Sequence, residues 1–173
     1  VCAVGGITGQ APFRRMEYRE AIARYGSDKP DLRFGMELCD VTQHFAAGRE
    51  KLRIEGNVQA LAATGAAAFS RKQLDELAEQ AKKLGARGLY TIKVAAEGVT
   101  SSLDKTLGSD AIAAIVAATG AKPGDLIVAV SAAEQIPGTD AAALIAGRLR
   151  LSLAERLALI PKEIAVVPML EFD

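Results

Sequence analysis

The connections between the predicted strands and helices are short, and this spacing constrains the fold more than any other feature. Segments rich in β-branched residues alternate irregularly with amphipathic segments. We expect helices at residues 17–25, 70–84, 109–119 and 139–159, and strands at 51–62 (bent at Gly56), 88–94, 126–130 and 164–167. Connections this short cannot carry the crossovers of a large wound parallel sheet. The pattern therefore predicts an α+β fold, a two-layer sandwich in which a mainly antiparallel sheet has helices on one face.

Ser70 begins the strongest helix signal in the chain. Ser70-Arg-Lys-Gln73 is a capping box, in which the hydroxyl and the side-chain amide bind backbone groups that have no helical partner. An apolar stripe at helical spacing follows, formed by Leu74, Leu77, Ala78, Ala81 and Leu84. Gly85 then supplies the end of the helix. This segment is predicted to pack one face on the sheet.

The segment from Arg24 to Gly35 is dense in glycine, proline and charge. Gly26 is placed to end the helix before it, and Pro30 lacks an amide hydrogen and pushes the preceding residue out of the helical region. The residues around Pro30 must therefore form a loop. After the loop we expect a short strand at residues 36–38 and then a brief helix capped by Asp40.

The charge balance and the cysteine content restrict the class of protein. Lys plus Arg and Asp plus Glu number 21 each, so no net charge attracts the chain to nucleic acid or to an acidic membrane. Cys2 and Cys39 match no motif spacing and indicate free thiols rather than a disulfide. No apolar run approaches the roughly 20 residues that span a membrane. We expect a cytoplasmic protein with no membrane partner, and the start at Val1 indicates a fragment of a longer chain.

The sequence predicts no active site within this chain. Nothing in it resembles a nucleophile with its base, a set of metal ligands or a coupled pair of carboxylates. We therefore predict no catalytic residue, no cofactor-binding residue and no metal site.

Two sets of charged residues are candidates for a binding role. The first is the loop segment with Arg24, Tyr25, Gly26, Ser27, Asp28, Lys29, Pro30, Asp31 and Arg33. In one interpretation, its charges help to order the wall of an active site. In the other, they stabilise the loop itself: its aspartates accept hydrogen bonds from backbone amides and pair with Arg24 and Arg33. The second set is Arg14, Arg15, Arg148 and Arg150. These cations either contact phosphates of a nucleic acid or belong to a solvated surface of mixed charge.

The twelve residues from Arg24 to Gly35 read Arg-Tyr-Gly-Ser-Asp-Lys-Pro-Asp-Leu-Arg-Phe-Gly, and they resemble the signature of bacterial-type aspartyl-tRNA synthetases. Further blocks occur in the order seen in the GAD domain that is inserted into the catalytic core of that family, at residues 69–77, 85–94 and 119–126. Residues 168–173 resemble the return to the core. Residues 164–167 depart from the pattern, because they are shorter than the family's exit strand and lack its aromatic residues.

The resemblance implies a division of the chain and a function for the whole enzyme. Residues 1–47 would lead from the catalytic core into the insertion, residues 48–163 would be the GAD-like α+β domain, and residues 164–173 would return to the core. The parent, a homodimer, would use ATP and Mg²⁺ to attach aspartate to tRNA-Asp. The catalytic motifs lie outside this segment, so the segment alone would be inactive. Its insertion domain would have a structural role or an auxiliary contact with tRNA.

The second hypothesis comes from another class of protein. It is a free-standing, non-catalytic interaction domain related to the same module in a subunit of tRNA-dependent amidotransferases. The run from Arg24 to Gly35 favours the synthetase, because the resemblance places that run in the core rather than in the module. Whether the parent also charges tRNA-Asn stays open at this point.

Overall fold

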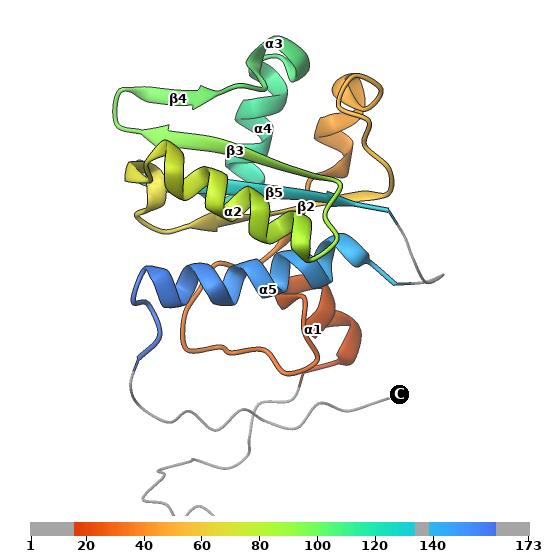
Figure 1. Ribbon diagram of the computed structural model, residues 1–173, viewed down its shortest axis with the longest axis vertical. Coiled ribbons are helices and arrows are strands. Elements are labelled where there is room, and N and C mark those ends of the chain that lie inside the picture. The colour runs from red at the N-terminus through yellow and green to blue at the C-terminus, as the bar shows by residue number, and fades with distance from the viewer. Residues whose placement is uncertain (1–15, 134–138, 162–173) are drawn as a thin grey trace, which may run out of the picture.

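A five-stranded sheet lies at the centre of the computed structural model, which describes residues 16–133 and 139–161 (Figure 1). The strands are β1 (Cys39–Asp40), β2 (Asn57–Ala63), β3 (Gly88–Ala95), β4 (Gly98–Ser101) and β5 (Leu126–Ala132). Their order across the sheet is β1-β2-β5-β3-β4, and every neighbouring pair is antiparallel. The predicted α+β class with a mainly antiparallel sheet is therefore confirmed.

Helices cover both faces of the sheet. Helices α2 (Arg71–Lys83) and α5 (Ala141–Arg156) pack on one face (Figure 1). The 3₁₀ helix η2 (Thr42–Gly48) and the helices α3 (Asp104–Leu107) and α4 (Ser109–Thr119) pack on the other. The prediction that helices lie on one face only was therefore wrong, and the fold has three layers.

The central strand β5 explains the third layer. All of its seven residues are buried. Val128 and Val130 belong to the core formed with α2 and α5, whereas Ile127 and Ala129 belong to the core formed with α4. A strand covered on both faces is a continuous apolar run and lacks the alternation of a half-exposed strand. The apolar run of β5 thus agrees with a sheet that is covered on both faces.

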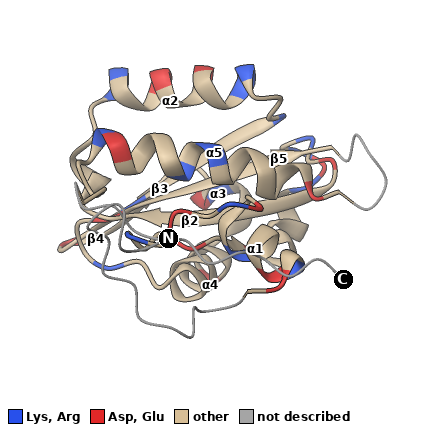
Figure 2. Ribbon diagram, turned by 90° about the horizontal axis from the view of Figure 1, so that it is seen from below, with Lys and Arg blue, Asp and Glu red and all other residues tan. Residues whose placement is uncertain are grey.

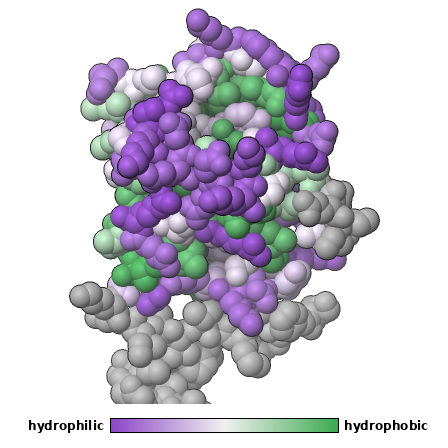
Figure 3. Space-filling view, in the orientation of Figure 1, coloured by the Kyte–Doolittle hydropathy of each residue, from purple (hydrophilic) through white to green (hydrophobic). Residues whose placement is uncertain are grey.

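Helix α2 has the ends that its sequence predicts. The Ser70 hydroxyl accepts a hydrogen bond from the Gln73 amide at 3.3 Å, and the Gln73 side chain accepts one from the Ser70 amide at 2.9 Å. Leu77 and Ala81 are fully buried against the sheet. Basic residues lie at the two ends of α2 and acidic residues between them (Figure 2), and its outer side is hydrophilic (Figure 3). The capping box and the apolar stripe are both confirmed.

Two strand boundaries differ from the sequence-based expectation. Strand β2 begins only at Asn57, because residues 51–53 form a turn, and Ile54 is buried in the core beneath η2 and α4. The apparent alternation before Gly56 therefore reflects a buried residue that follows a turn rather than a strand. The short strand expected at residues 36–38 is instead found at residues 39 and 40, as β1, which pairs with β2.

The remaining differences are at helix ends and in a hairpin. Helix α5 starts at Ala141, and Asp140 is its N-cap, with a carboxylate oxygen that accepts from the Ala143 amide at 3.0 Å. The expected start was Thr139. The hairpin of β3 and β4 was not predicted. The expected strand at residues 164–167 lies outside the described residues.

Candidate functional site

The candidate site is the loop between α1 (Tyr18–Tyr25) and β1, residues 26–38, which we call the Arg150 loop. Helix α1 ends where the sequence predicts, with Gly26 at a φ of 64° and its amide bound to the Ile22 carbonyl at 2.9 Å. The loop then runs along the side of α5 that faces away from the sheet (Figure 1). Pro30 is buried within it. The predicted loop is thus present and is attached to α5.

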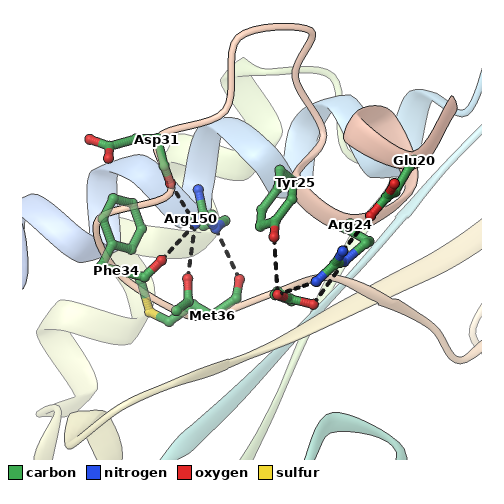
Figure 4. A network of polar contacts seen from close by, with 9 residues as sticks. Glu20, Arg24, Tyr25, Asp31, Phe34, Met36 and Arg150 are labelled. Carbon is green, nitrogen blue, oxygen red and sulfur yellow. Dashed lines mark hydrogen bonds and ion pairs between the residues drawn. The ribbon is translucent and has the colours of Figure 1, made fainter. Parts of the chain in front are cut away.

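Arg150 projects from α5 into this loop (Figure 4). Its Nε donates to the Met36 carbonyl at 3.1 Å, and its Nη2 lies 2.9–3.0 Å from three more carbonyl oxygens, those of Asp31, Phe34 and Gly35. The guanidinium also stacks on the Phe34 ring, 4.2 Å from its centroid. The residue is only 2% exposed. The prediction that Arg150 contacts tRNA was therefore wrong, since its cation faces the protein's own backbone.

The electrostatics around Arg150 combine burial with nearby negative charge. Burial lowers the pKa of the Arg150 guanidinium, while Tyr25, Asp31 and Glu37 act in the opposite direction. Guanidinium groups stay protonated in proteins despite such shifts. The buried group is consequently a permanent cation whose hydrogen-bond donors point at the loop carbonyls.

Arg24 belongs to a second cluster at the edge of the loop. It binds Glu37 through two hydrogen bonds, Nε to Oε2 at 3.0 Å and Nη2 to Oε1 at 2.7 Å, and it also pairs with Glu20 (Figure 4). The Tyr25 hydroxyl donates to the same Glu37 carboxylate at 3.0 Å. The Arg24 hydrogen bonds hold the pKa of Glu37 below its usual range. The expected pairing of Arg24 with the loop aspartates was wrong, because two glutamates lie nearer.

Asp31 and Arg33 form the pairing that the sequence predicts. The Arg33 guanidinium donates to both oxygens of Asp31, at 2.6 Å and 3.0 Å, and the Arg33 amide donates to Asp31 Oδ1 at 3.0 Å. The hydrogen bond from Arg33 lowers the pKa of Asp31. Asp28 is exposed, and the amide of Lys29 is instead bound by the Ser27 hydroxyl at 3.1 Å. The loop charges therefore serve largely to shape the loop itself.

A pocket of about 330 Å³ lies between the start of this loop, α1 and α5. Arg148 is exposed at the pocket, and so are Asp28 and Lys29. Arg148 thus remains a candidate for a phosphate contact. Arg14 and Arg15 lie outside the described residues.

Sequence reasoning missed Glu37 and the role of Arg150. Neither residue stands at a motif spacing, and Arg150 lies more than 110 positions from the carbonyls that it binds.

Within the described ranges no group of three or more His, Cys, Asp and Glu side chains is arranged to hold a metal ion. Among the same residues, Cys39 is a free thiol, and burial raises its pKa to about 11. No helix of the described part is both long and apolar enough to cross a membrane.

Comparison with known proteins identifies the family. The GAD domain model matches residues 49–137, more than half of the 173-residue chain. An aspartate–tRNA(Asp/Asn) ligase of Moorella thermoacetica is 42% identical over 173 residues, which cover 96% of this chain and 28% of that protein. Aspartate–tRNA ligases of Clostridium botulinum and Staphylococcus aureus are 38% and 36% identical over 91% and 98% of this chain.

The chain spans only 26–30% of the length of these relatives. Its similarity to them extends beyond the GAD match on both sides, because the aligned part includes nearly all of its residues. The chain therefore belongs to the GAD domain family and resembles the GAD-containing central segment of bacterial-type aspartyl-tRNA synthetases.

Proposed function

We propose that the chain is the central segment of an aspartate–tRNA ligase. The observation that carries this proposal is the extent of the similarity. The relatives align over 91–98% of the chain, whereas the GAD match covers residues 49–137 alone. A GAD module shared with an unrelated protein would account for the match but not for similarity over α1 and the Arg150 loop.

The proposed division of the chain follows from the same comparison. Residues 1–47, which include α1 and the whole Arg150 loop, would belong to the catalytic core. Residues 48–163 would form the inserted GAD domain, and residues 164–173 would return to the core. In this division α5 belongs to the insertion and binds a loop of the core.

The whole enzyme would attach aspartate to tRNA-Asp in the cytoplasm, with ATP and Mg²⁺, as a homodimer. The names of the relatives include both an aspartate–tRNA ligase and an aspartate–tRNA(Asp/Asn) ligase. Both tRNA-Asp and tRNA-Asn are therefore substrates to be tested. We assign no residue of this chain to ATP or Mg²⁺, and we propose that the chain alone is inactive.

Within the enzyme, the segment would act mainly as a scaffold, with an auxiliary contact to tRNA. The exposed cations around the pocket support such a contact, because phosphate binding needs only positive charge at a suitable separation. Arg148 is the described residue that we propose for it, and Arg14 and Arg15 are proposed from the sequence. The neighbouring Asp28 weakens the local positive charge.

The proposal is tested by two measurements. Aminoacylation of tRNA-Asp and of tRNA-Asn is measured with the whole protein that contains this chain, and with the 173-residue chain alone. Aspartate transfer by the whole protein supports the ligase. Its absence, together with tight binding of another protein to the 173-residue chain, favours the free-standing interaction domain.

The tRNA contact is tested by titrating the 173-residue chain with labelled tRNA-Asp and an unrelated tRNA, at low and at moderate salt. Saturable binding that prefers tRNA-Asp, weakens with salt and decreases in Arg148→Met supports the contact. Equal weak binding to both RNAs leaves the segment as a scaffold. Arg71→Met, an exposed arginine of α2, is the matched control.

A further inference from the structure

Helix α5 is buried on two opposite sides. Leu149 and Leu153 on one side are fully buried in the core that α5 shares with β2 and β5. The other side lies against α1 and the Arg150 loop (Figure 1). Because the contacts on both sides of α5 are close-packed, the position of α5 on the sheet also determines where α1 and the Arg150 loop lie.

The contact between α1 and α5 requires glycine on both partners. A Cβ atom at Gly147 of α5 would lie 2.5 Å from the Tyr25 carbonyl oxygen. A Cβ atom at Gly26 would lie 2.0 Å from the Ala143 carbonyl oxygen, at a φ that already favours glycine. The backbones therefore meet directly, and this contact fixes where the Arg150 loop begins.

Arg150 fixes the other end of the loop. It binds four carbonyl oxygens between residues 31 and 36, so it acts on the backbone path rather than on one side chain. Met36, whose carbonyl is one of the four, has a φ of 61°, which is unfavourable for a residue with a side chain. A strained backbone persists only where its surroundings hold it. The Arg150 guanidinium supplies one such support, through its hydrogen bond to the Met36 carbonyl.

We propose that α5 sets the conformation of the Arg150 loop, with Arg150 as the positioning residue. The loop would open locally without this arginine, while the sheet would keep its structure. Resting on the proposed function, the consequence is that the inserted GAD domain holds a loop of the catalytic core in its working shape. The insertion would then support aspartate activation without touching the reactants.

The structural part is tested by hydrogen exchange and mass spectrometry on the 173-residue chain. In Arg150→Met, amides of residues 27–38 should exchange about 10- to 100-fold faster, the factor that corresponds to one lost charged hydrogen bond. Arg150→Lys keeps the charge but not the planar fork, and should show a smaller increase. Peptides from β5 should be unchanged in both variants, and Arg71→Met should match the native chain throughout.

Two results of this experiment would overturn the proposal. One is unchanged exchange in the loop. The other is an equal increase in the loop and in β5, which would make Arg150 a general stabilising residue. If Arg150→Met does not fold, the comparison of Arg150→Lys with the native chain decides between these outcomes.

The functional part is tested with the whole ligase, by aspartate-dependent exchange of pyrophosphate into ATP. Arg150→Met should lower kcat by about 10- to 100-fold, as expected for a misplaced active-site element, with the KM for ATP changed by less than about threefold. Arg150→Lys should recover part of kcat. Unchanged kcat despite faster loop exchange would refute the link to catalysis. If the native protein shows no activation at all, the proposed function fails, and the exchange experiment still decides the role of Arg150.

Discussion

The sheet and the Arg150 loop differ in how they are held together. The sheet is stabilised by two apolar cores, one on each face, to which many side chains contribute. The Arg150 loop places Phe34, Met36 and Leu38 at one of these cores. Its backbone path is held in addition by one arginine, one glycine contact and two clusters of ion pairs. Hydrophobic burial is spread over area, whereas a hydrogen-bonded anchor depends on single groups. Damage to the sheet should thus be global, and damage to the loop should be local.

The largest effect is expected from Phe45→Ala in the sheet core. Phe45 is fully buried, with its ring 5.3 Å from the Tyr90 ring. Removing a buried phenyl ring costs about 3–5 kcal/mol through lost burial and the cavity that remains. Urea denaturation should show this decrease in the free energy of unfolding. Val99→Ala, at an exposed residue of β4, is the control, and a loss below about 1 kcal/mol for Phe45→Ala would contradict the assigned core.

Gly147→Ala tests the contact between α1 and α5. Alanine favours a helix over glycine by about 0.5–1 kcal/mol, but a Cβ atom 2.5 Å from the Tyr25 carbonyl must displace α1, at about 1–3 kcal/mol. We expect a net loss of about 1–2 kcal/mol in urea denaturation, because the steric cost is the larger of these two effects. Gly35→Ala, in the Arg150 loop, has open space for its methyl group and should change the free energy of unfolding little. A stabilised Gly147→Ala chain would mean that α1 does not pack as described.

Ser70→Ala tests a purely local interaction. The hydroxyl caps α2, and its loss should lower the free energy of unfolding by about 1 kcal/mol. Ser109→Ala is an informative comparison, because Ser109 is the first residue of α4 and the start of that helix has no side-chain cap. Thermal unfolding should separate the two variants, and equal midpoints would contradict the capping role of Ser70.

The smallest effect is expected from Asp31→Asn, and it should depend on pH. The pKa of Asp31 in the folded chain is lowered below its ordinary value of 3.8 by the hydrogen bond from Arg33. A lowered carboxylate pKa contributes stability above the ordinary value, and this contribution is lost as the pH falls through the folded value. The native chain should thus be more stable than Asp31→Asn at pH 7, with the difference shrinking as the pH falls below 3.8.

Ion pairs that stay partly in contact with solvent contribute little, which is why this effect is ranked last. Hydrogen exchange of the Arg150 loop amides at pH 7 and pH 3 measures the contribution of this ion pair more directly than global unfolding does. Asp75→Asn removes an exposed pair with Arg71 on α2 and serves as the control. A difference between the native chain and Asp31→Asn that grows toward acid would contradict the assigned interaction.

Local features of this fold could be read from the sequence. The capping box at Ser70, the end of α1 at Gly26 and the loop at Pro30 all depend on residues within a few positions of one another. The resemblance to aspartyl-tRNA synthetases also came from a contiguous run of residues, and the family match agrees with it. The α+β class followed from the short connections between elements.

The candidate site could be predicted only in part. The pairing of Asp31 with Arg33 joins residues two positions apart and was expected. The pairing of Arg24 with Glu37 joins residues 13 positions apart, across a loop whose path the sequence does not specify. Arg148 and Arg150 looked alike in the sequence, yet one is exposed and the other is buried. Which side of α5 faces the loop depends on how the helix packs on the sheet.

The sequence by itself determined the family, the local ends of α1 and α2, and the presence of a charged loop before the GAD domain. Only the tertiary structure decided that helices cover both faces of the sheet and that Arg150 anchors the loop. The physical reason is the range of the interactions. Caps and turns are formed by neighbours in the chain, whereas the contacts of Arg150 exist only after the sheet has placed α5 beside a loop more than 110 residues away.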